Sequence, residues 1–132
     1  MNKPDEQIKP VNVGILGLGT VGGGTATVLR RNAEEIARRA GREIKLLAAS
    51  VRDINKPRDV NVDGILLTED SNEIVNHPDI DIVLELIGGT DLARDLVLRA
   101  ISNGKHVVTA NKALIALHGN EIFLAAQRKG VT

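Results

Sequence analysis

A glycine-rich turn near the start of the chain is the clearest candidate for a chemical site. Gly17, Gly19 and Gly22 form the pattern G-x-G-x-x-G between an apolar stretch and a segment with helical spacing. In that setting the first glycine permits a tight turn, the second lets the backbone approach a pyrophosphate, and the third allows close helix packing. The N–H groups at the start of the helix, around Thr20 and Val21, would face the phosphates. The pattern predicts a dinucleotide site, with a tight turn that binds nothing as the alternative.

The end of the second expected strand indicates which dinucleotide would be preferred. A site for NAD usually carries a carboxylate about 20 residues beyond the glycines, where it binds the ribose hydroxyls. Here the strand expected at 44–51 ends with Ser50 and is followed by Arg52, not by an acid. A guanidinium suits a 2′-phosphate, because its planar fork donates two charge-assisted hydrogen bonds. Arg52 therefore favours NADP over NAD, with an exposed ion pair to Asp53 as the alternative.

Two further strand ends carry residues that would meet a ligand. Lys112 lies in the turn after the strand expected at 106–109, where an ammonium group could bind a substrate carboxylate or the cofactor. The alternative is a solvated lysine at the start of a helix. Gly88 and Gly89 follow the strand expected at 80–86. They either relax the turn or let the backbone approach the nicotinamide ribose.

Other polar residues give weaker signals. Glu85 lies inside an apolar strand, and a buried carboxylate needs a hydrogen-bond partner that the sequence does not reveal. The histidines His77, His106 and His118 lack the spacing of metal ligands, and we interpret them as structural. Cysteine is absent, which excludes disulfides and thiolate chemistry. We expect no metal site.

The elements that would position these residues alternate between strand and helix. Strands are expected at 11–16, 44–51, near 64–67, 80–86 and 106–109, and helices at 20–40, 71–76, 91–103 and 119–129. The helix at 91–103 should turn inward Leu92, Leu96, Val97, Ala100 and Ile101. Residues 1–10 are expected to be a disordered lead-in, 11–132 one domain, and 131–132 the opening of a further strand. This order predicts an α/β fold with a doubly wound parallel sheet of the Rossmann type, which binds ligands at the carboxyl ends of its strands.

Composition excludes several classes of function. The 132 residues hold 17 basic and 17 acidic side chains, so no net field attracts nucleic acid or an anionic membrane. Phe123 is the one aromatic residue, which removes the stacking platforms of proteins that bind single-stranded nucleic acid. The polar start and the lack of a run of about 18 apolar residues predict no secretion signal and no membrane span. A cytoplasmic protein with a small-molecule substrate is the expectation.

Four segments together resemble the bacterial homoserine dehydrogenases. They are GLGTVGGG at 17–24, VRD at 51–53, PDIDIVLELIGG at 78–89 and VVTANKALIA at 107–116. The likeness covers nearly the whole chain after residue 10, and its last two segments are more specific than the glycine pattern. It implies an NAD(P)-dependent oxidoreductase that interconverts homoserine and aspartate semialdehyde, on the route to threonine and methionine.

The resemblance also implies roles for single residues. Val21 and the neighbouring backbone would hold the pyrophosphate, Arg52 would meet the adenosine 2′-phosphate, and Lys112 would lie beside the cofactor and near the substrate. Members of this family continue into a substrate-binding and dimerising domain that holds the lysine and aspartate of proton transfer. We therefore expect this chain to bind cofactor without turnover of its own. We assign it no proton-transfer residue, and expect the full-length enzyme to be a homodimer or homotetramer through the further domain.

Two alternatives remain open. One is the cofactor domain of another NAD(P)-dependent dehydrogenase that acts on a different aldehyde or a sugar. The other is a nucleotide-sensing or CoA-binding module without chemistry. Lys112 argues against a sensor, because a sensor needs no cation beside the nicotinamide.

Overall fold

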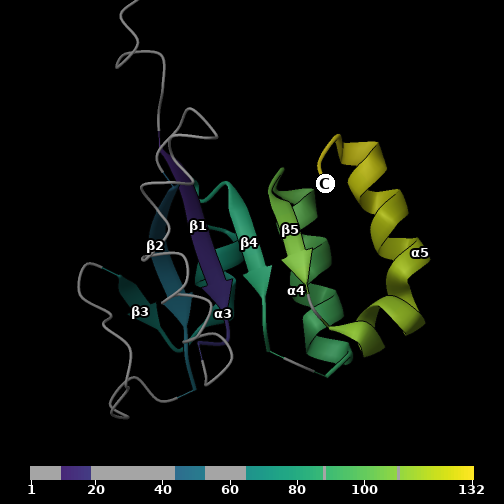
Figure 1. Cartoon of the computed structure of the whole chain (residues 1–132), viewed down its shortest axis with the longest axis horizontal. Coiled ribbons are helices and arrows are strands. Elements are labelled where there is room, and N and C mark those ends of the chain that lie inside the picture. The colour runs from purple at the N-terminus through teal and green to yellow at the C-terminus, as the bar shows by residue number, and fades with distance from the viewer. Residues whose placement is uncertain (1–9, 19–43, 53–64, 88, 110) are drawn as a thin grey trace, which may run out of the picture.

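The computed structural model describes residues 10–18, 44–52, 65–87, 89–109 and 111–132. The described part forms an α/β structure whose strands all run parallel, in the order β3-β2-β1-β4-β5 (Figure 1). The strands are β1 (Val11–Leu16), β2 (Ile44–Ser50), β3 (Leu66–Thr68), β4 (Ile82–Glu85) and β5 (His106–Thr109). The helices are α3 (Ser71–Val75), α4 (Asp91–Ser102) and α5 (Lys112–Lys129). The doubly wound parallel sheet of the Rossmann type is thereby confirmed.

Several expectations lie outside the described residues. These are residues 1–9 of the lead-in expected at 1–10, the helix at 20–40, Asp53, and the site residues Gly19, Thr20, Val21, Gly22 and Gly88. The strands that are described match the expected ones closely, although β4 is shorter than the expected 80–86. Residues 131–132 form no strand, but the Thr132 carbonyl accepts a hydrogen bond of 2.8 Å from the N–H of Val107 in β5.

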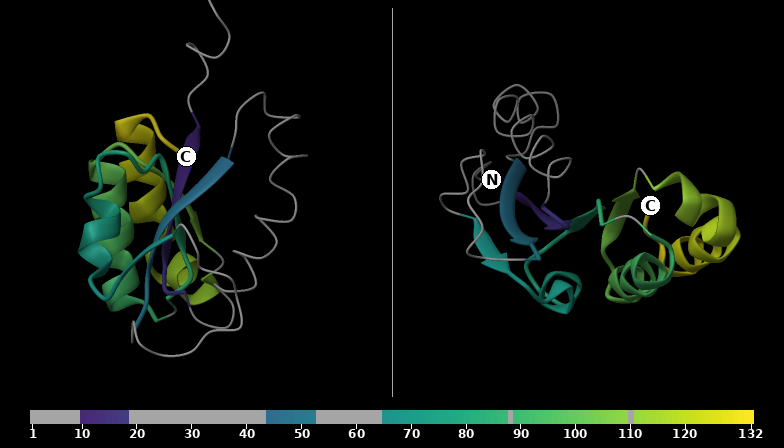
Figure 2. Two further views of the ribbon diagram at one scale, coloured as in Figure 1. Left: turned by 90° about the vertical axis from the view of Figure 1, so that its left-hand side faces the viewer. Right: turned by 90° about the horizontal axis from the view of Figure 1, so that it is seen from below.

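The carboxyl half of β1, at the centre of the sheet, is buried because its residues are apolar on both faces. Successive residues of β1 point to opposite faces of the sheet, so Leu16 packs in one cluster and Ile15 in another, and both are fully buried. The Leu16 cluster joins the sheet to α3 and α4, which lie on the same face (Figure 2, left). Its buried members are Leu16, Ala48, Ile74, Val75, Ile80, Val83, Leu96 and Ala100. An aliphatic core of this kind is what the near absence of aromatic residues requires.

The inward face of α4 differs by one residue from the expected one. Leu92 is 59% exposed, so its expected inward position is wrong. The buried stripe begins instead at Ala93 and continues through Leu96, Val97, Ala100 and Ile101. Those five positions follow the i, i+3, i+4, i+7, i+8 spacing of an amphipathic helix, and Leu92 falls beside the stripe.

Helix α5 begins seven residues before the expected start at 119. Asn111 caps it, since its side-chain oxygen accepts a hydrogen bond of 3.0 Å from the Leu114 N–H. Gly119 lies buried inside the helix and does not begin it. Helix α5 packs on α4 through a buried cluster that includes Val97, Leu114 and Ile122.

An ion pair also connects α4 and α5. The Arg94 guanidinium donates two hydrogen bonds of 2.6 Å to the Glu121 carboxylate, and this contact lowers the pKa of Glu121.

Within the described ranges, no helix combines the length and apolar character needed to cross a membrane.

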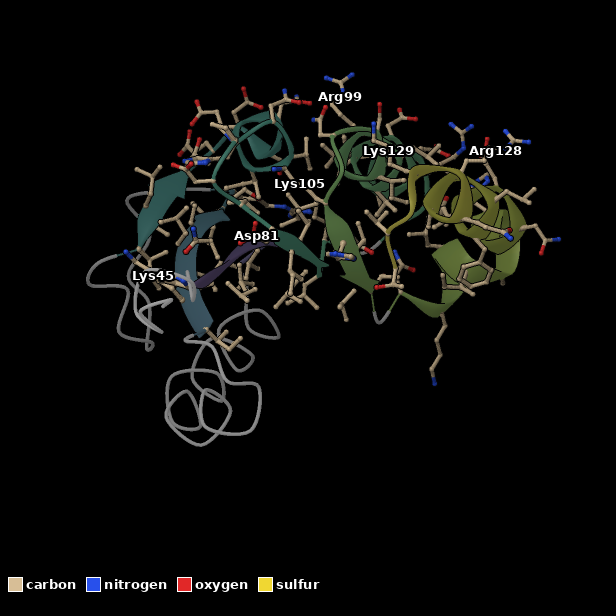
Figure 3. All side chains as sticks on the ribbon, turned by 90° about the horizontal axis from the view of Figure 1, so that it is seen from above. Lys45, Asp81, Arg99, Lys105, Arg128 and Lys129 are labelled. Carbon is tan, nitrogen blue, oxygen red and sulfur yellow. The ribbon has the colours of Figure 1, made fainter. Side chains whose placement is uncertain are left out.

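The amino-terminal edge of the sheet contains a buried lysine. Lys105 is 4% exposed, and its ammonium donates hydrogen bonds to the carbonyls of His77 and Ile80, the latter at 2.7 Å. Burial lowers the pKa of Lys105, while the nearby carboxylates Asp81 and Asp79 partly oppose that shift. Figure 3 looks onto this edge, with Lys105 and Asp81 labelled near its centre. Lys105 therefore ties the start of β5 to the turn that precedes β4.

Candidate dinucleotide site

The candidate residues that the structure describes gather at the carboxyl edge of the sheet. Leu16, Glu85 and Thr109 end β1, β4 and β5, and they stand in register across the three strands. The residues that follow, Gly17 and Lys112 among them, therefore emerge at one edge, which faces the viewer in the right panel of Figure 2. In doubly wound sheets this is the edge at which ligands bind.

Gly17 makes the turn out of β1 with a backbone that suits glycine. Its φ is +87°, and a Cβ added there would lie 3.0 Å from the Ile87 Cα and 3.2 Å from the Ile87 nitrogen. The glycine turn thus packs directly against the backbone that leaves β4. A side chain at this position would be strained and would also press on that backbone.

We expect Gly17→Ala to lower the free energy of unfolding by more than a left-handed glycine replacement alone. A non-glycine residue at positive φ costs about 1–2 kcal/mol, and overpacking typically adds about 1–3 kcal/mol. Gly130→Ala is the matched control, since Gly130 has a φ of +77° but an added Cβ there meets nothing within 4 Å. Urea unfolding followed by circular dichroism measures both losses. Equal losses would show that the contact with Ile87 costs nothing.

Ser50 holds the glycine turn from the neighbouring strand. Its buried hydroxyl oxygen accepts hydrogen bonds from the Gly17 N–H at 3.1 Å and from the Ser71 hydroxyl at 2.8 Å. The Ser50 carbonyl accepts another, of 2.8 Å, from the Leu18 N–H. This positioning role was not foreseen. The available signal was a small polar residue at the end of an otherwise buried strand.

Arg52 lies two residues beyond the end of β2, and it is exposed. Among the described residues, none forms an ion pair with it. The alternative partner, Asp53, lies outside those residues. Arg52 thus lies at the carboxyl edge of the sheet, in the segment expected to contact the adenosine ribose.

Glu85 has partners that the sequence did not reveal. Its carboxylate is fully buried at the end of β4. The Thr109 hydroxyl donates to Oε1 at 2.7 Å, and the Ile87 N–H donates to Oε2 at 2.8 Å. A buried carboxylate is thus satisfied by donors from β5 and from the chain that leaves its own strand.

Asn111 and Lys112 bring the start of α5 to the same edge. The Asn111 side-chain amide donates a hydrogen bond of 2.5 Å to the Gly89 carbonyl, while its backbone N–H donates to the Thr109 hydroxyl at 3.0 Å. Lys112 is the first residue of α5, and its side chain is exposed. Gly89, with a φ of +72°, has open space where a Cβ would lie. Asn111, the residue before Lys112, therefore connects the start of α5 to Gly89.

The histidines take part in separate local contacts. His77 Nδ1 accepts a hydrogen bond from the Asp79 N–H at 3.1 Å, and His106 Nδ1 accepts one from the Thr132 N–H at 3.1 Å. His118 lies 3.9 Å from Glu121 on α5. Within the ranges that the structure describes, no group of three or more potential ligands is arranged to hold a metal ion.

Comparison with known proteins identifies the family. A family model of the homoserine dehydrogenase NAD-binding domain matches residues 17–132. The homoserine dehydrogenase of Pseudomonas aeruginosa is 61% identical over 124 residues, and that of Neisseria gonorrhoeae is 53% identical over 124 residues. Each alignment covers 94% of this chain and 28% of the relative.

A solved structure agrees with these relatives. The homoserine dehydrogenase of Thiobacillus denitrificans superposes with a TM-score of 0.88 at 63% identity, over 94% of this chain and 28% of that one. The present chain thus spans less than a third of the length of these relatives. It belongs to the homoserine dehydrogenase family, in which it corresponds to the NAD-binding domain.

Proposed function

We propose that this chain is the cofactor-binding domain of an enzyme that reversibly reduces L-aspartate 4-semialdehyde to L-homoserine with NAD(P)H. The observation that carries the proposal is the position of Gly17, Arg52 and Lys112 at the carboxyl edge of the sheet, in a chain that belongs to the homoserine dehydrogenase family. The enzyme would act in the synthesis of threonine and methionine.

Each of the residues at this edge would contact a different part of the cofactor. The Gly17 turn, held by Ser50, would place the following backbone N–H groups of residues 19–22 against the pyrophosphate. Arg52 would bind the adenosine 2′-phosphate, which makes NADP the favoured cofactor. Bound nicotinamide supplies the hydride, and the protein supplies orientation and electrostatics. Backbone around Gly88 and Gly89 would approach the nicotinamide ribose.

Lys112 would interact with the cofactor and the substrate. A cation in the first turn of a helix faces the positive end of the helix dipole, which disfavours it by about 0.3–1 kcal/mol. Lys112 occupies that unfavourable place on α5 and leaves its side chain exposed at the ligand edge. Its position is therefore better explained by an electron-rich ligand than by helix stability. Proton transfer would belong to residues outside this chain.

The test uses the full-length protein that contains this chain. We expect oxidation of NADPH that depends on aspartate semialdehyde, while the chain alone binds NADPH in calorimetry without turnover. Oxidation that depends on another aldehyde or a sugar would favour a related dehydrogenase. Binding of nucleotide without oxidation by any of these substrates would favour a sensing module.

We expect Arg52→Ala to weaken NADP binding by about 1.5–3 kcal/mol, or roughly 10- to 150-fold, and to leave NAD binding nearly unchanged. The reason is that the guanidinium would contact the phosphate that NAD lacks. Arg128→Ala is the matched control, because Arg128 is exposed near the end of α5, away from the carboxyl edge (Figure 3). Calorimetric titration with both cofactors measures the effect. Equal weakening of NAD and NADP would contradict the assignment.

The proposal extends to assembly and location. The full-length enzyme would be a homodimer or homotetramer, joined through the part of the protein outside this chain, and would act in the cytoplasm. Light scattering of the full-length protein measures the first point, and a monomeric active enzyme would contradict it.

A further inference from the structure

A continuous chain of hydrogen bonds runs along the ligand edge from β4 to α5. It starts at the Glu85 carboxylate, passes through the Thr109 hydroxyl to the Asn111 N–H, and continues from the Asn111 side chain to the Gly89 carbonyl. A branch connects Glu85 to the Ile87 N–H. The chain therefore joins the exit of β4, the exit of β5 and the first turn of α5.

The direction of these hydrogen bonds is fixed by the donors. The backbone N–H of Asn111 can only donate, so the Thr109 hydroxyl oxygen must accept from it. The single hydroxyl proton of Thr109 is then available to Glu85, whose Oε1 lies 2.7 Å away. Thr109 thus connects the buried Glu85 carboxylate to the backbone of Asn111 through two hydrogen bonds.

Asn111 completes the connection by using four of its polar groups. Its N–H contacts Thr109, its side-chain amide contacts Gly89, its side-chain oxygen caps Leu114, and its carbonyl accepts from Ile115 at 3.2 Å. Each contact restricts the backbone from which Lys112 projects. The backbone of Lys112, whose side chain is long and flexible, is thereby held beside the residues that follow β4.

We propose that Glu85, Thr109 and Asn111 are positioning residues that hold the backbone of Lys112 in place relative to Ile87 and Gly89, which follow β4. The inference rests on the proposed function, in which Lys112 meets cofactor and substrate. A packing role alone would not require a fully buried carboxylate, since an apolar side chain would fill the same space at lower desolvation cost.

The test is a double-mutant cycle in the full-length enzyme. Thr109→Val keeps the shape of the side chain and removes the hydroxyl, and Thr109→Ser keeps the hydroxyl. We expect Thr109→Val to lower kcat by about 10- to 100-fold, because small misplacements of a reacting group cost up to about 10²-fold. Thr109→Ser should recover most of that loss. In the Lys112→Ala background, Thr109→Val should lower kcat by about twofold or less, because the effects of residues that act through one another are not additive.

Equal losses from Thr109→Val in both backgrounds would overturn the proposal, as would a serine variant as slow as the valine variant. If Thr109→Val fails to fold, Glu85→Gln takes its place in the cycle. Glutamine can still accept from the Ile87 N–H, but its amide NH2 group then faces the Thr109 hydroxyl, whose proton loses its acceptor. Equal losses of kcat from Glu85→Gln in the wild-type and Lys112→Ala backgrounds would then overturn the proposal.

Hydrogen exchange gives a readout that does not depend on turnover. Thr109→Val should speed exchange of the Asn111 and Leu114 N–H groups, whereas Thr109→Ser should not. Unchanged exchange in the valine variant would overturn the positioning role. A wild-type enzyme without activity on aspartate semialdehyde would defeat the proposed function alone, and the exchange result would still decide this inference.

Discussion

Lys112→Ala is expected to lower kcat of the full-length enzyme by about 10²- to 10³-fold, the loss typical when one electrostatic donor is removed from a reacting centre. The ammonium group projects from the first turn of α5 at the edge where cofactor and substrate would meet. Its removal would leave developing negative charge without that donor. Steady-state kinetics with aspartate semialdehyde and NADPH measures the effect.

The control for this change lies on the same helix. Lys129 is the exposed last residue of α5, so Lys129→Ala removes an equal charge far from the ligand edge (Figure 3). Its turnover should match the wild type. Lys112→Ala should not lower the thermal stability of α5, because a cation in the first helical turn opposes the dipole. An unaltered kcat with unaltered Michaelis constants would remove Lys112 from the site.

Lys105→Met is expected to lower the free energy of unfolding by about 1.5–3 kcal/mol near neutral pH, the range for hydrogen bonds to charged groups. The change removes the donor for the His77 and Ile80 carbonyls and leaves the buried one at Ile80 unpaired. Urea unfolding measures the loss. Lys45→Met is the matched control, since Lys45 is an exposed lysine near the same edge (Figure 3). It should change stability little.

The effect of Lys105 should grow with pH. Burial lowers the pKa of Lys105 below its ordinary value of 10.5, so the unfolded chain binds this proton more tightly than the folded protein does. Between the folded and unfolded pKa values, stability therefore rises with pH. The difference in unfolding free energy between wild type and Lys105→Met should accordingly widen as pH rises towards 10.5. A constant difference over that range would show that Lys105 keeps an ordinary pKa.

Local patterns predicted most of the described architecture. The apolar runs that contain β1, β2 and β4 are soon followed by Gly17, Arg52 and Gly88, which is why the ligand edge could be located although the exact strand ends could not. The error at α5 has a local cause as well. The expected start at 119 treats Gly119 as a boundary, although Asn111 can supply the capping oxygen and no residue between them breaks a helix.

Contacts between strands were harder to predict. Thr109 and Glu85 are 24 residues apart, and Gly17 and Ser50 are 33 apart. They meet only because parallel strands bring their last residues level, and the register that does so is set by packing across the whole sheet. A single sequence shows that Glu85 needs a partner but not which residue provides it.

The buried lysine at one end of the strands and the dinucleotide edge at the other have a practical consequence for protein engineering. Substitutions that improve the packing around Lys105 can raise thermal stability without altering the surface that would select a coenzyme. Redesign of coenzyme preference can likewise be confined to the opposite end. The two properties should therefore be improvable in parallel and then combined in one variant.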